Sequence, residues 1–487
     1  MRTFNLKTLS FFVLIAFFIS FSSFLEPCYA RKGGNKQHWR KKQKGYGGDH
    51  RRSVREDSYI TPEETAVTLG ENSGGVSNVF NVLDYGAKGD GKADDTKAFE
   101  AAWAAACKVQ SSTMSVPSGS VFLVKPISFS GPNCEANIVF QLDGKIIAPT
   151  SSGDWGSGLL QWIEFTKLKG ISIKGSGIID GQGSVWWSDS PKYNPANEAT
   201  YSSLDNSQAT ENNSGEMPST KPTALRFYGS DGVSVTGITL QNSPQAHLKF
   251  DDCTNVQVSD ISISSPGNSP NTDGIHLQNS QNADISATSI ACGDDCISIQ
   301  TGCSNVNIHN VNCGPGHGVS IGGLGKDNTK ACVSNVTVRD VQMHNTLTGV
   351  RIKTWQGGSG SVRNIMFSNI QLTEVETPIV IDQFYCDKSN CQNQSSAVAV
   401  SGVNYVNIQG TYTSEPVRFA CSDSSPCTGV SLDTIELKSV DEGKQLYDPF
   451  CWEAYGVLKT STVPQIDCLK NGKPSTITQS GSSDSSC

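Results

Sequence analysis

The most constraining feature of this chain is a short segment that recurs from residue 232 onward. The segment Gly232-Val-Ser-Val-Thr-Gly-Ile-Thr-Leu has counterparts that begin at Asn255, Asn305, Asn335 and Asn364, with a weaker copy at Asn282. Successive asparagines are 23 to 30 residues apart, and each copy holds two short stretches of alternating apolar and polar residues around a turn, as β-strands do. A strand-only repeat of this length matches one coil of a parallel β-helix. A propeller blade needs about 40 residues, and leucine-rich repeats carry a different pattern of leucines.

Two further patterns agree with a β-helix. The aligned asparagines occupy the same place in each coil, which predicts a stacked ladder of side chains with a structural role. Asp94 and Asp95 can cap a helix from Lys97 to about Lys108. Its apolar face would cover the open end of the coil and carries Phe99, Ala102, Trp103 and Ala106. We therefore predict an all-β fold, a single-stranded parallel β-helix over residues 79–470 with a short N-terminal capping helix.

The two ends of the chain are predicted to lie outside that fold. Residues 1–30 have a basic start, an apolar run over residues 9–24 and small residues around a cleavage point, which is typical of a secretory signal peptide. Residues 31–78 form a leader in which residues 31–55 carry ten Lys and Arg against one acidic residue. The leader is expected to be disordered, either as a propeptide or linker or as a tether to an acidic polysaccharide. Residues 471–487 form a C-terminal tail.

Charge and cysteine content narrow the function. Residues 56–487 have 26 Lys and Arg and 44 Asp and Glu, a formal charge of −18. A segment this acidic is not expected to bind nucleic acid, and it could bind a polyanionic substrate only in a local basic cleft. No segment after the signal peptide is apolar enough to span a membrane. The chain is therefore expected to be soluble, secreted and extracellular.

The cysteines are expected to pair in an oxidising compartment. There are 16 cysteines, and removal of Cys28 with the signal peptide leaves 15, so one thiol should remain unpaired. No Cys-x-x-Cys/His set is present, so the sequence calls for no zinc site and no other metal or cofactor. Asn-x-Ser/Thr triplets stand at Asn212, Asn335 and Asn393, either as glycan acceptors or by chance.

Four short motifs follow one another at close to the spacing of the coils. They are Asn271-Thr-Asp273-Gly, Gly293-Asp294-Asp295-Cys, Gly316-His317-Gly and Arg351-Ile-Lys353. Asp273, Asp295 and His317 are 22 residues apart each time. In coils of that length they should stack on one face, about 4.8 Å apart. The longer step to Arg351 fits a loop insertion at residues 322–334.

This set of residues suits hydrolysis of an acidic glycan. Glycoside hydrolysis needs one carboxylic acid to protonate the leaving oxygen and another carboxylate to act as base or nucleophile, and crowding splits the pKa values of neighbouring carboxyls. Arg351 and Lys353 are two apart on a strand, so both should face the same side and bind a uronic acid carboxylate. Asp294 and Asp295 can both reach that side only if the strand bends or ends there, and Gly293 would permit such a bend. Each motif alone is an ordinary turn or surface feature, and their order and spacing carry the prediction.

With these four motifs the chain resembles the polygalacturonases, in particular the plant branch, over about residues 79–470. The resemblance implies a right-handed parallel β-helix that hydrolyses α-1,4-galacturonosidic bonds of pectin with inversion, as a monomer and without a cofactor. It implies Asp294 as the general acid, Asp273 and Asp295 as the bases that hold the water, and His317 as support for the acid. It also implies a substrate-binding role for Asn271, Arg351, Lys353 and Tyr385.

The resemblance also bears on the disulfides and on the alternatives. Cys296 and Cys313 match a family disulfide that would hold the catalytic turns. Cys386–Cys391 and Cys421–Cys427 are expected as short bridges, and three cysteines would pin the C-terminal end with their pairing left open: Cys451, Cys468 and Cys487. The alternatives are a related hydrolase of rhamnogalacturonan or xylogalacturonan, a calcium-dependent pectate lyase, and a non-catalytic wall-binding protein. Endo or exo action and tolerance of methyl esters stay open.

Overall fold

The computed structural model describes residues 78–187, 217–387, 391, 393–441 and 446–474. All of them belong to one compact unit, Gly74–Cys487. The predicted signal peptide and basic leader, the triplet at Asn212, Cys28, Cys487 and most of the C-terminal tail lie outside the described residues. The domain boundaries given above therefore stay a prediction. No helix among the described residues is both long and apolar enough to cross a membrane.

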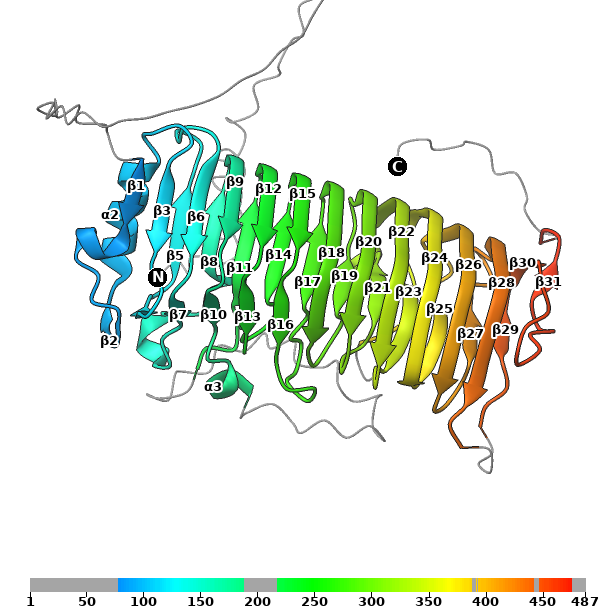
Figure 1. Cartoon of the computed structure of the whole chain (residues 1–487). Coiled ribbons are helices and arrows are strands. Elements are labelled where there is room, and N and C mark those ends of the chain that lie inside the picture. The colour runs from blue at the N-terminus through cyan, green and yellow to red at the C-terminus, as the bar shows by residue number, and fades with distance from the viewer. Residues whose placement is uncertain (1–77, 188–216, 388–390, 392, 442–445, 475–487) are drawn as a thin grey trace, which may run out of the picture. The chain divides into compact units, whose positions relative to one another are not determined.

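Parallel strands hold just over half of the described residues, and they gather in two sheets that run the length of the coil (Figure 1). One sheet has 11 strands, each paired in parallel with the corresponding strand of the next coil. Its strands are β5 (Ile127–Ser130), β8 (Gln161–Thr166), β11 (Thr223–Tyr228), β14 (Leu248–Asp251), β17 (Ile275–Gln278), β19 (Ile297–Ile299), β21 (Val319–Leu324), β23 (Thr348–Trp355), β25 (Thr377–Tyr385), β27 (Val417–Ala420) and β29 (Phe450–Trp452). This sheet carries the candidate site.

The other sheet has 20 strands and forms the remaining sides of each coil. Its first strands are β1 (Val79–Asn81), β2 (Asp90–Asp94), β3 (Thr113–Val116), β4 (Val121–Leu123), β6 (Ile138–Leu142), β7 (Lys145–Ile147), β9 (Lys169–Lys174), β10 (Ile178–Asp180), β12 (Asp231–Thr236), β13 (Thr239–Gln241), β15 (Thr254–Ser259) and β16 (Ser262–Ser264). The later strands are β18 (Gln281–Ala291), β20 (Ser304–Cys313), β22 (Lys330–His344), β24 (Ser359–Val375), β26 (Ala399–Tyr412), β28 (Cys427–Ser439), β30 (Ala454–Leu458) and β31 (Lys470–Asn471). The parallel pairing of successive coils confirms the predicted parallel β-helix.

The repeated segments form the coils as predicted, with one difference. In the coil that starts at Asn255, the two expected strands are separate, as β15 and β16. From β18 onward they are continuous and turn at a residue of positive φ, such as Ala287 or Asn310. Residues 322–334, expected as a loop insertion, are only partly a loop, because β21, the short helix η4 (Lys326–Asn328) and the start of β22 occupy most of them.

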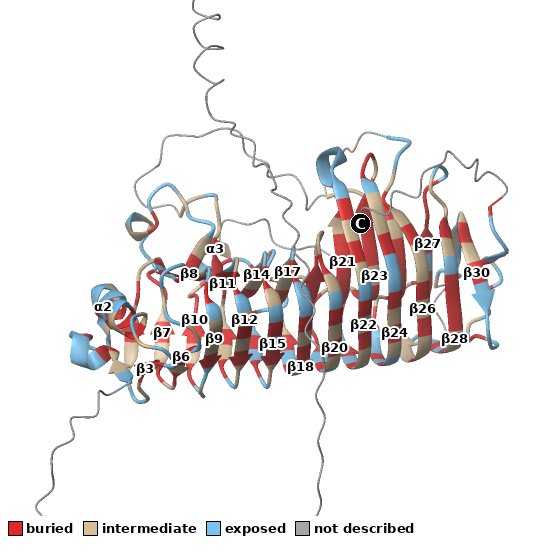
Figure 2. Cartoon of the chain, turned by 90° about the horizontal axis from the view of Figure 1, so that it is seen from above, coloured by how far each residue is buried: buried red, intermediate tan, exposed pale blue. Residues whose placement is uncertain are grey.

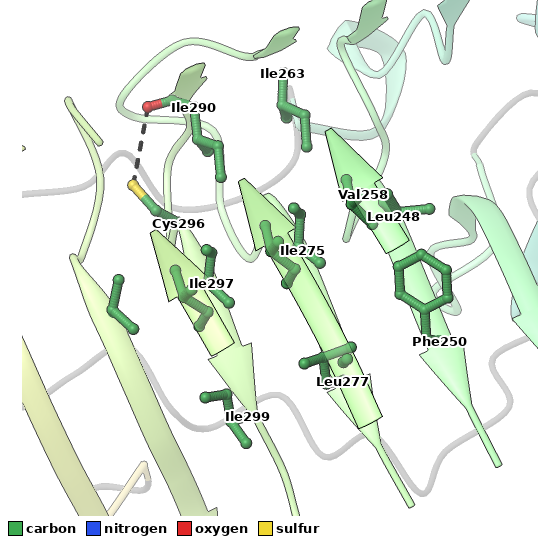
Figure 3. Close-up of a cluster of buried hydrophobic side chains, with 14 of the residues drawn as sticks. Leu248, Phe250, Val258, Ile263, Ile275, Leu277, Ile290, Cys296, Ile297 and Ile299 are labelled. Carbon is green, nitrogen blue, oxygen red and sulfur yellow. Dashed lines mark hydrogen bonds between the residues drawn. The ribbon is translucent and has the colours of Figure 1, made fainter. Parts of the chain in front are cut away.

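The core lies inside the coils, because alternate residues of each strand point inward. Figure 3 shows this for three neighbouring strands, in which Leu248, Phe250, Ile275, Leu277 and Ile297 pack together. The same alternation of buried with more exposed residues is visible along the strands in Figure 2. Burial of each such side chain contributes roughly 1.5–3 kcal/mol. The residues between them are thereby fixed on the outer face.

The predicted asparagine ladder is confirmed. Each ladder asparagine has a left-handed backbone, with φ between 55° and 57°, and its side-chain amide donates to the side-chain oxygen of the residue one coil earlier. The Nδ2–Oδ1 distances are 3.2 Å for Asn282 to Asn255, 3.1 Å for Asn305 to Asn282 and 3.0 Å for Asn335 to Asn305. Asn364 continues the ladder to Asn335 at 2.7 Å. The glycan triplet at Asn335 therefore coincides with a ladder position.

The predicted capping helix is confirmed as α2 (Thr96–Ala106). Phe99, Ala102, Trp103 and Ala106 are all buried, and the Trp103 ring lies 5.1 Å from that of Phe129 at the first strand of the 11-stranded sheet. The predicted cap was wrong in one respect. Asp95 precedes the helix but makes no capping bond; its carboxylate instead accepts from two backbone N–H groups of the preceding turn, those of Lys88 and Gly89. The other short helices are η1 (Val82–Tyr85), η2 (Ser152–Asp154) and α3 (Ser184–Trp187).

The disulfides agree with most of the cysteine predictions. The bridges Cys296–Cys313, Cys386–Cys391 and Cys421–Cys427 are present as predicted, and Cys451 pairs with Cys468. Cys107–Cys134 is an additional bridge, and Cys332 is also disulfide-bonded. The prediction of one unpaired thiol was wrong, because three buried thiols are free, those of Cys253, Cys292 and Cys303. Counting cysteines by parity cannot reveal how many thiols the fold leaves unpaired.

Candidate active site

The predicted site residues meet where the strands of the 11-stranded sheet begin. The parallel register aligns Ile275 of β17 with Ile297 of β19, and Ile297 with Val319 of β21. Asp273, Asp295 and His317 each stand two residues before these aligned positions, so they lie on successive rungs. The predicted stacking is confirmed by this register.

Asp295 is the buried centre of the cluster. Its side chain is 2% exposed and sits between two cations. Oδ1 accepts from Arg351 Nη2 at 2.9 Å, and Oδ2 accepts from Lys353 Nζ at 2.9 Å. The Ser320 hydroxyl donates to Oδ1 at 2.7 Å and accepts from Arg351 Nε at 3.1 Å. Burial raises the pKa of Asp295, but the charges of Lys353 and Arg351 outweigh burial and lower it below its ordinary value.

Arg351 and Lys353 do face the same side, as their spacing predicted. Both side chains, however, are hydrogen-bonded to Asp295. The sequence predicted that they would bind a carboxylate of the substrate and gave no sign that they also bind one of the protein. A buried carboxylate with two cationic partners fixes all three side chains, since none can move without leaving a buried charge unpaired. Burial lowers the pKa of Lys353, yet Asp295 restores it to above the ordinary value. The cations are thus held rigidly in place and leave a net positive charge next to Asp295.

Asp294 is more accessible than Asp295 and is bound differently. Its side chain is 18% exposed, and Oδ1 lies 3.1 Å from Nδ1 of His317. Oδ1 also accepts from the backbone N–H of Asp295 at 2.8 Å, and Asn271 Nδ2 lies 3.4 Å from Oδ2. Burial raises the pKa of Asp294, but His317 and then the cations outweigh it and lower the pKa. Asn271 and His317 therefore bracket this carboxylate.

Asp273 has the opposite electrostatic character. Burial, and then the charges of Asp294 and Asp295, raise the pKa of Asp273 well above its ordinary value. Its backbone is held by His247, whose backbone N–H and Nδ1 both lie against the Asp273 carbonyl, at 2.8 and 2.9 Å. The other ring nitrogen of His247 lies 2.7 Å from the Ser265 hydroxyl. The pKa values of the three carboxyls therefore differ: that of Asp273 is raised, and those of Asp294 and Asp295 are lowered.

The adjacent aspartates lie in the turn between the end of β18 at Ala291 and the start of β19 at Ile297, so the strand ends before them, as one of the two expected arrangements required. The role predicted for Gly293 was different from the one observed. Its φ is not in the left-handed region. A Cβ at Gly293 would instead meet the Ser269 carbonyl oxygen at 1.8 Å, so glycine is required by the close approach of two turns. The Thr272 hydroxyl accepts from the Gly293 N–H at 2.9 Å and locks that approach.

Tyr385 also lies at the site. Lys353 Nζ stands 5.2 Å from the centroid of its ring. The ring packs edge-on against Trp355 at 5.4 Å, and Lys326 of η4 covers Trp355 at 5.1 Å. The aromatic rings of Tyr385 and Trp355 therefore lie next to Lys353.

A metal would fit poorly here. One oxygen of Asp294, one of Asp295 and one ring nitrogen of His317 lie within 4.8 Å of one another, as metal ligands could. Both oxygens of Asp295 already accept from Arg351 and Lys353, so an added cation would face two positive charges. The donor set is better suited to proton transfer between carboxyls.

Sequence reasoning missed three side chains of this neighbourhood. Ser320 bonds both Asp295 and Arg351, His247 holds the backbone of Asp273, and His276 lies on β17 beside the cluster. Ser320 stands one strand position after Val319, on the rung of the His317 motif. A search of the outward positions of each motif strand would have found Ser320 and His276.

Comparison with known proteins gives a consistent result. The model of a single family, described as "Glycosyl hydrolases family 28", matches residues 107–448. A protein named "Polygalacturonase" from Cryptomeria japonica is 43% identical over 363 residues, which cover 74% of this chain and 67% of that protein. "Polygalacturonase-2" from Solanum lycopersicum is 43% identical over 365 residues, covering 74% and 75% of the two chains.

Solved structures share the fold. A polygalacturonase from Erwinia carotovora is 24% identical, with a TM-score of 0.57 over 74% of this chain and 94% of that one. An endo-xylogalacturonan hydrolase from Aspergillus tubingensis is 20% identical, with a TM-score of 0.61 over 77% and 98% of the two chains. At these identities the likeness shows the parallel β-helix and does not choose between substrates.

Proposed function

Because this chain belongs to family 28 of the glycosyl hydrolases, we propose that it is a polygalacturonase, which hydrolyses the α-1,4-galacturonosidic bonds of de-esterified pectin. Relatives 41–43% identical over about three quarters of the chain carry the name polygalacturonase. The observation that carries the proposal is the cluster itself: Asp273, Asp294 and Asp295 on neighbouring rungs beside Arg351 and Lys353. Carboxyls supply acid and base, and the cations supply the match to a uronic acid.

In the proposed mechanism Asp294 protonates the leaving oxygen, while Asp273 and Asp295 hold the attacking water. His317 supports the acid, Asp294. Arg351 and Lys353 bind a galacturonate carboxylate. The sugar is also contacted by Asn271 and Tyr385. The geometry fits these roles. The Asp294 side chain is more exposed than that of Asp295, so it can reach the leaving oxygen, whereas Asp295 is held in place by its two cationic partners.

The free protein holds its proton elsewhere, on Asp273, since that carboxyl has the raised pKa and Asp294 the lowered one. A bound galacturonate carboxylate would offset the positive charge of Arg351 and Lys353. That charge is among the causes that lower the pKa of Asp294, so substrate binding raises it. The three carboxyls titrate as one coupled group, and the proton moves to Asp294 when the substrate arrives.

The stereochemical outcome needs its own test. Inverting enzymes commonly separate their carboxyl groups by about 6.5–9.5 Å, to leave room for the water. Oxygen atoms of Asp294 and Asp295 approach within 4.8 Å, so the water must lie between Asp273 and Asp295 for inversion. Proton NMR of the first product settles this: a β-anomer supports inversion, and an α-anomer rejects it.

The disulfides indicate an extracellular, oxidising environment. Secretion by the N-terminal signal peptide, action in the plant cell wall and a monomeric state are proposed together with the function. The basic leader, 31–55, is proposed as a segment that is either removed or binds the acidic wall polysaccharide. N-terminal sequencing of the protein from a plant culture medium distinguishes these two fates.

The proposed function is tested by reducing-end release from polygalacturonate, rhamnogalacturonan and xylogalacturonan, each with and without a chelator. We expect release from polygalacturonate that the chelator does not change. Loss with chelator and an unsaturated product would indicate a lyase, and no release from any substrate would indicate a wall-binding protein. The sizes of the products then separate endo from exo action.

A further inference from the structure

His247 is a buried titratable side chain that the proposed mechanism does not use. It directly precedes Leu248, the first residue of β14. Asp273 stands two residues before Ile275, the first residue of β17. These strands are parallel neighbours, and Leu248 and Ile275 lie on adjacent strands in Figure 3. His247 is 0% exposed, so water from the solvent cannot reach its ring, and its hydrogen bonds are made within the protein.

The partners of the His247 ring fix its protonation state. Nδ1 lies 2.9 Å from the backbone carbonyl oxygen of Asp273, and a carbonyl oxygen only accepts, so Nδ1 carries the proton. Nε2 lies 2.7 Å from the Ser265 hydroxyl. Burial lowers the pKa of His247 to about 4, although hydrogen bonds with the backbone of Asp273 and Ser264 oppose that effect, so the ring is neutral at ordinary pH. In the neutral ring Nε2 is an acceptor, and the Ser265 hydroxyl donates to it.

The ring thereby joins the two ends of one turn. Ser265 directly follows the last residue of β16, and Asp273 ends the same turn ahead of β17. Within the turn, the Ser269 hydroxyl lies 2.7 Å from that of Thr272, and the Thr272 hydroxyl accepts from the backbone N–H of Gly293 in the next coil. The turn that carries Asp273 is therefore bonded internally, to the coil that follows it and, through His247, to the coil that precedes it.

Two groups of His247 donate to the Asp273 carbonyl. The backbone N–H donates at 2.8 Å as part of the pairing between coils, and it is present in every variant at position 247 except proline. The second donor, Nδ1–H, depends on the imidazole. A second bond to the same carbonyl limits rotation of the Asp273 backbone, and the carboxyl moves with that backbone. Substitution of His247 therefore tests the imidazole while the pairing of the coils is kept.

We propose that His247 is a positioning residue for Asp273: its Nδ1–H holds the Asp273 carbonyl, and Ser265 holds the ring in the orientation and tautomer that make this bond. The inference rests on the proposed function, in which Asp273 holds the attacking water. A shift of about 1 Å at a catalytic group can lower turnover about 100-fold. His247 is too deeply buried to touch the substrate. Its loss should therefore lower kcat and leave KM close to that of the wild type.

Three substitutions in the full-length protein separate the two bonds of the ring. His247→Asn keeps an N–H near the position of Nδ1 and loses the bond to Ser265. His247→Gln keeps an oxygen near the position of Nε2, which can accept from Ser265, and loses the bond to Asp273. His247→Leu loses both bonds. On polygalacturonate we expect kcat to fall roughly 10- to 100-fold in His247→Leu and His247→Gln. In His247→Asn the amide N–H needs no tautomer, so kcat should stay within a few-fold of the wild type.

A double variant tests whether His247 acts through Asp273. In Asp273→Asn the carboxyl that His247 positions is absent, so the addition of His247→Leu should lower kcat no further. Ser265→Ala removes the donor that orients the ring and should lower kcat a few-fold. Ser112→Ala is its matched control, because the Ser112 hydroxyl is also buried and donates to a backbone carbonyl, that of Ala106, far from the site. The kcat of Ser112→Ala should equal that of the wild type.

Thermal midpoints followed by circular dichroism separate positioning from loss of the fold. The proposal is rejected if His247→Leu keeps the kcat of the wild type, or if His247→Asn and His247→Gln lose kcat by the same factor. It is also rejected if His247→Leu lowers kcat equally in the wild type and in Asp273→Asn, since that result indicates a structural histidine. If His247→Leu does not fold, the comparison of His247→Asn with His247→Gln decides. Failure of the wild type to cleave polygalacturonate would reject the proposed function instead.

Discussion

Asp273 and Asp295 are neighbours in one cluster, yet replacing each by asparagine should change stability in opposite directions. Asp295 is buried between Arg351 and Lys353. In Asp295→Asn the amide places one NH₂ group against a cation and leaves both positive charges buried without a counter-ion. Breaking a buried ion pair by removing one partner costs about 3–5 kcal/mol. A loss of that size should be plain in any unfolding curve.

Asp273→Asn should instead stabilise the fold at neutral pH. The pKa of Asp273 is raised in the folded protein, first by burial and then by Asp294 and Asp295. A carboxyl with a raised pKa stabilises the fold below its unfolded pKa, near 3.8, and loses that contribution as the pH rises through the folded value. At pH 7 the Asp273 carboxyl therefore opposes folding, because the folded state favours a proton that the unfolded chain has already lost, and the neutral amide removes that penalty. Below about pH 3.8 the gain should vanish.

The assay is urea unfolding at pH 7 and at pH 3.5, followed by far-ultraviolet circular dichroism. Asp252→Asn serves as the matched control, because Asp252 is exposed and follows the C-terminal end of β14, outside the cluster. We expect a lower urea midpoint for Asp295→Asn, a higher midpoint at pH 7 for Asp273→Asn, and no change for the control. Asp295→Asn with the stability of the wild type, or Asp273→Asn destabilised at pH 7, would refute the electrostatic reasoning.

Three further predictions concern the scaffold and the chemistry. Gly293→Ala should reduce activity and stability together, because the new Cβ would meet the Ser269 carbonyl at 1.8 Å; wild-type activity and thermal midpoint in this variant would contradict the close approach. Asn305→Ala removes the ladder bonds to Asn282 and Asn335 and should cost about 1–3 kcal/mol by urea unfolding; an unchanged midpoint would show that the ladder is not stabilising. Dialysis against a chelator should leave turnover of polygalacturonate unchanged, and activity restored only by added calcium would overturn the metal-free account.

The periodic parts of this protein could be predicted because they depend on local pattern. The asparagine steps predicted the coils and the ladder, and the 22-residue spacing placed Asp273, Asp295 and His317 on successive rungs. In a solenoid each coil contacts only its neighbours, so spacing along the chain converts directly into position on a face. The capping helix followed from the same kind of regularity.

The remaining features depend on contacts between coils that no local pattern records. Asp295 pairs with Arg351 and Lys353 across a coil of irregular length. The sequence therefore predicted only that the two cations would bind a carboxylate of the substrate. Asp95 was expected to cap α2, but its carboxylate binds a neighbouring turn. The need for glycine at position 293 arises from Ser269, which is 24 residues earlier and close only after the coil has formed. The sequence therefore predicted which residues gather, and the structure shows how they are bonded.

The most direct test of the account is the turnover of Asp294→Asn on polygalacturonate, measured with its substrate affinity by calorimetry. Loss of a general acid should lower kcat by about 10²–10⁴-fold, while affinity stays within a few-fold because Arg351 and Lys353 are unchanged. Turnover equal to that of the wild type would contradict the central claim that the carboxyls on these rungs cleave the bond.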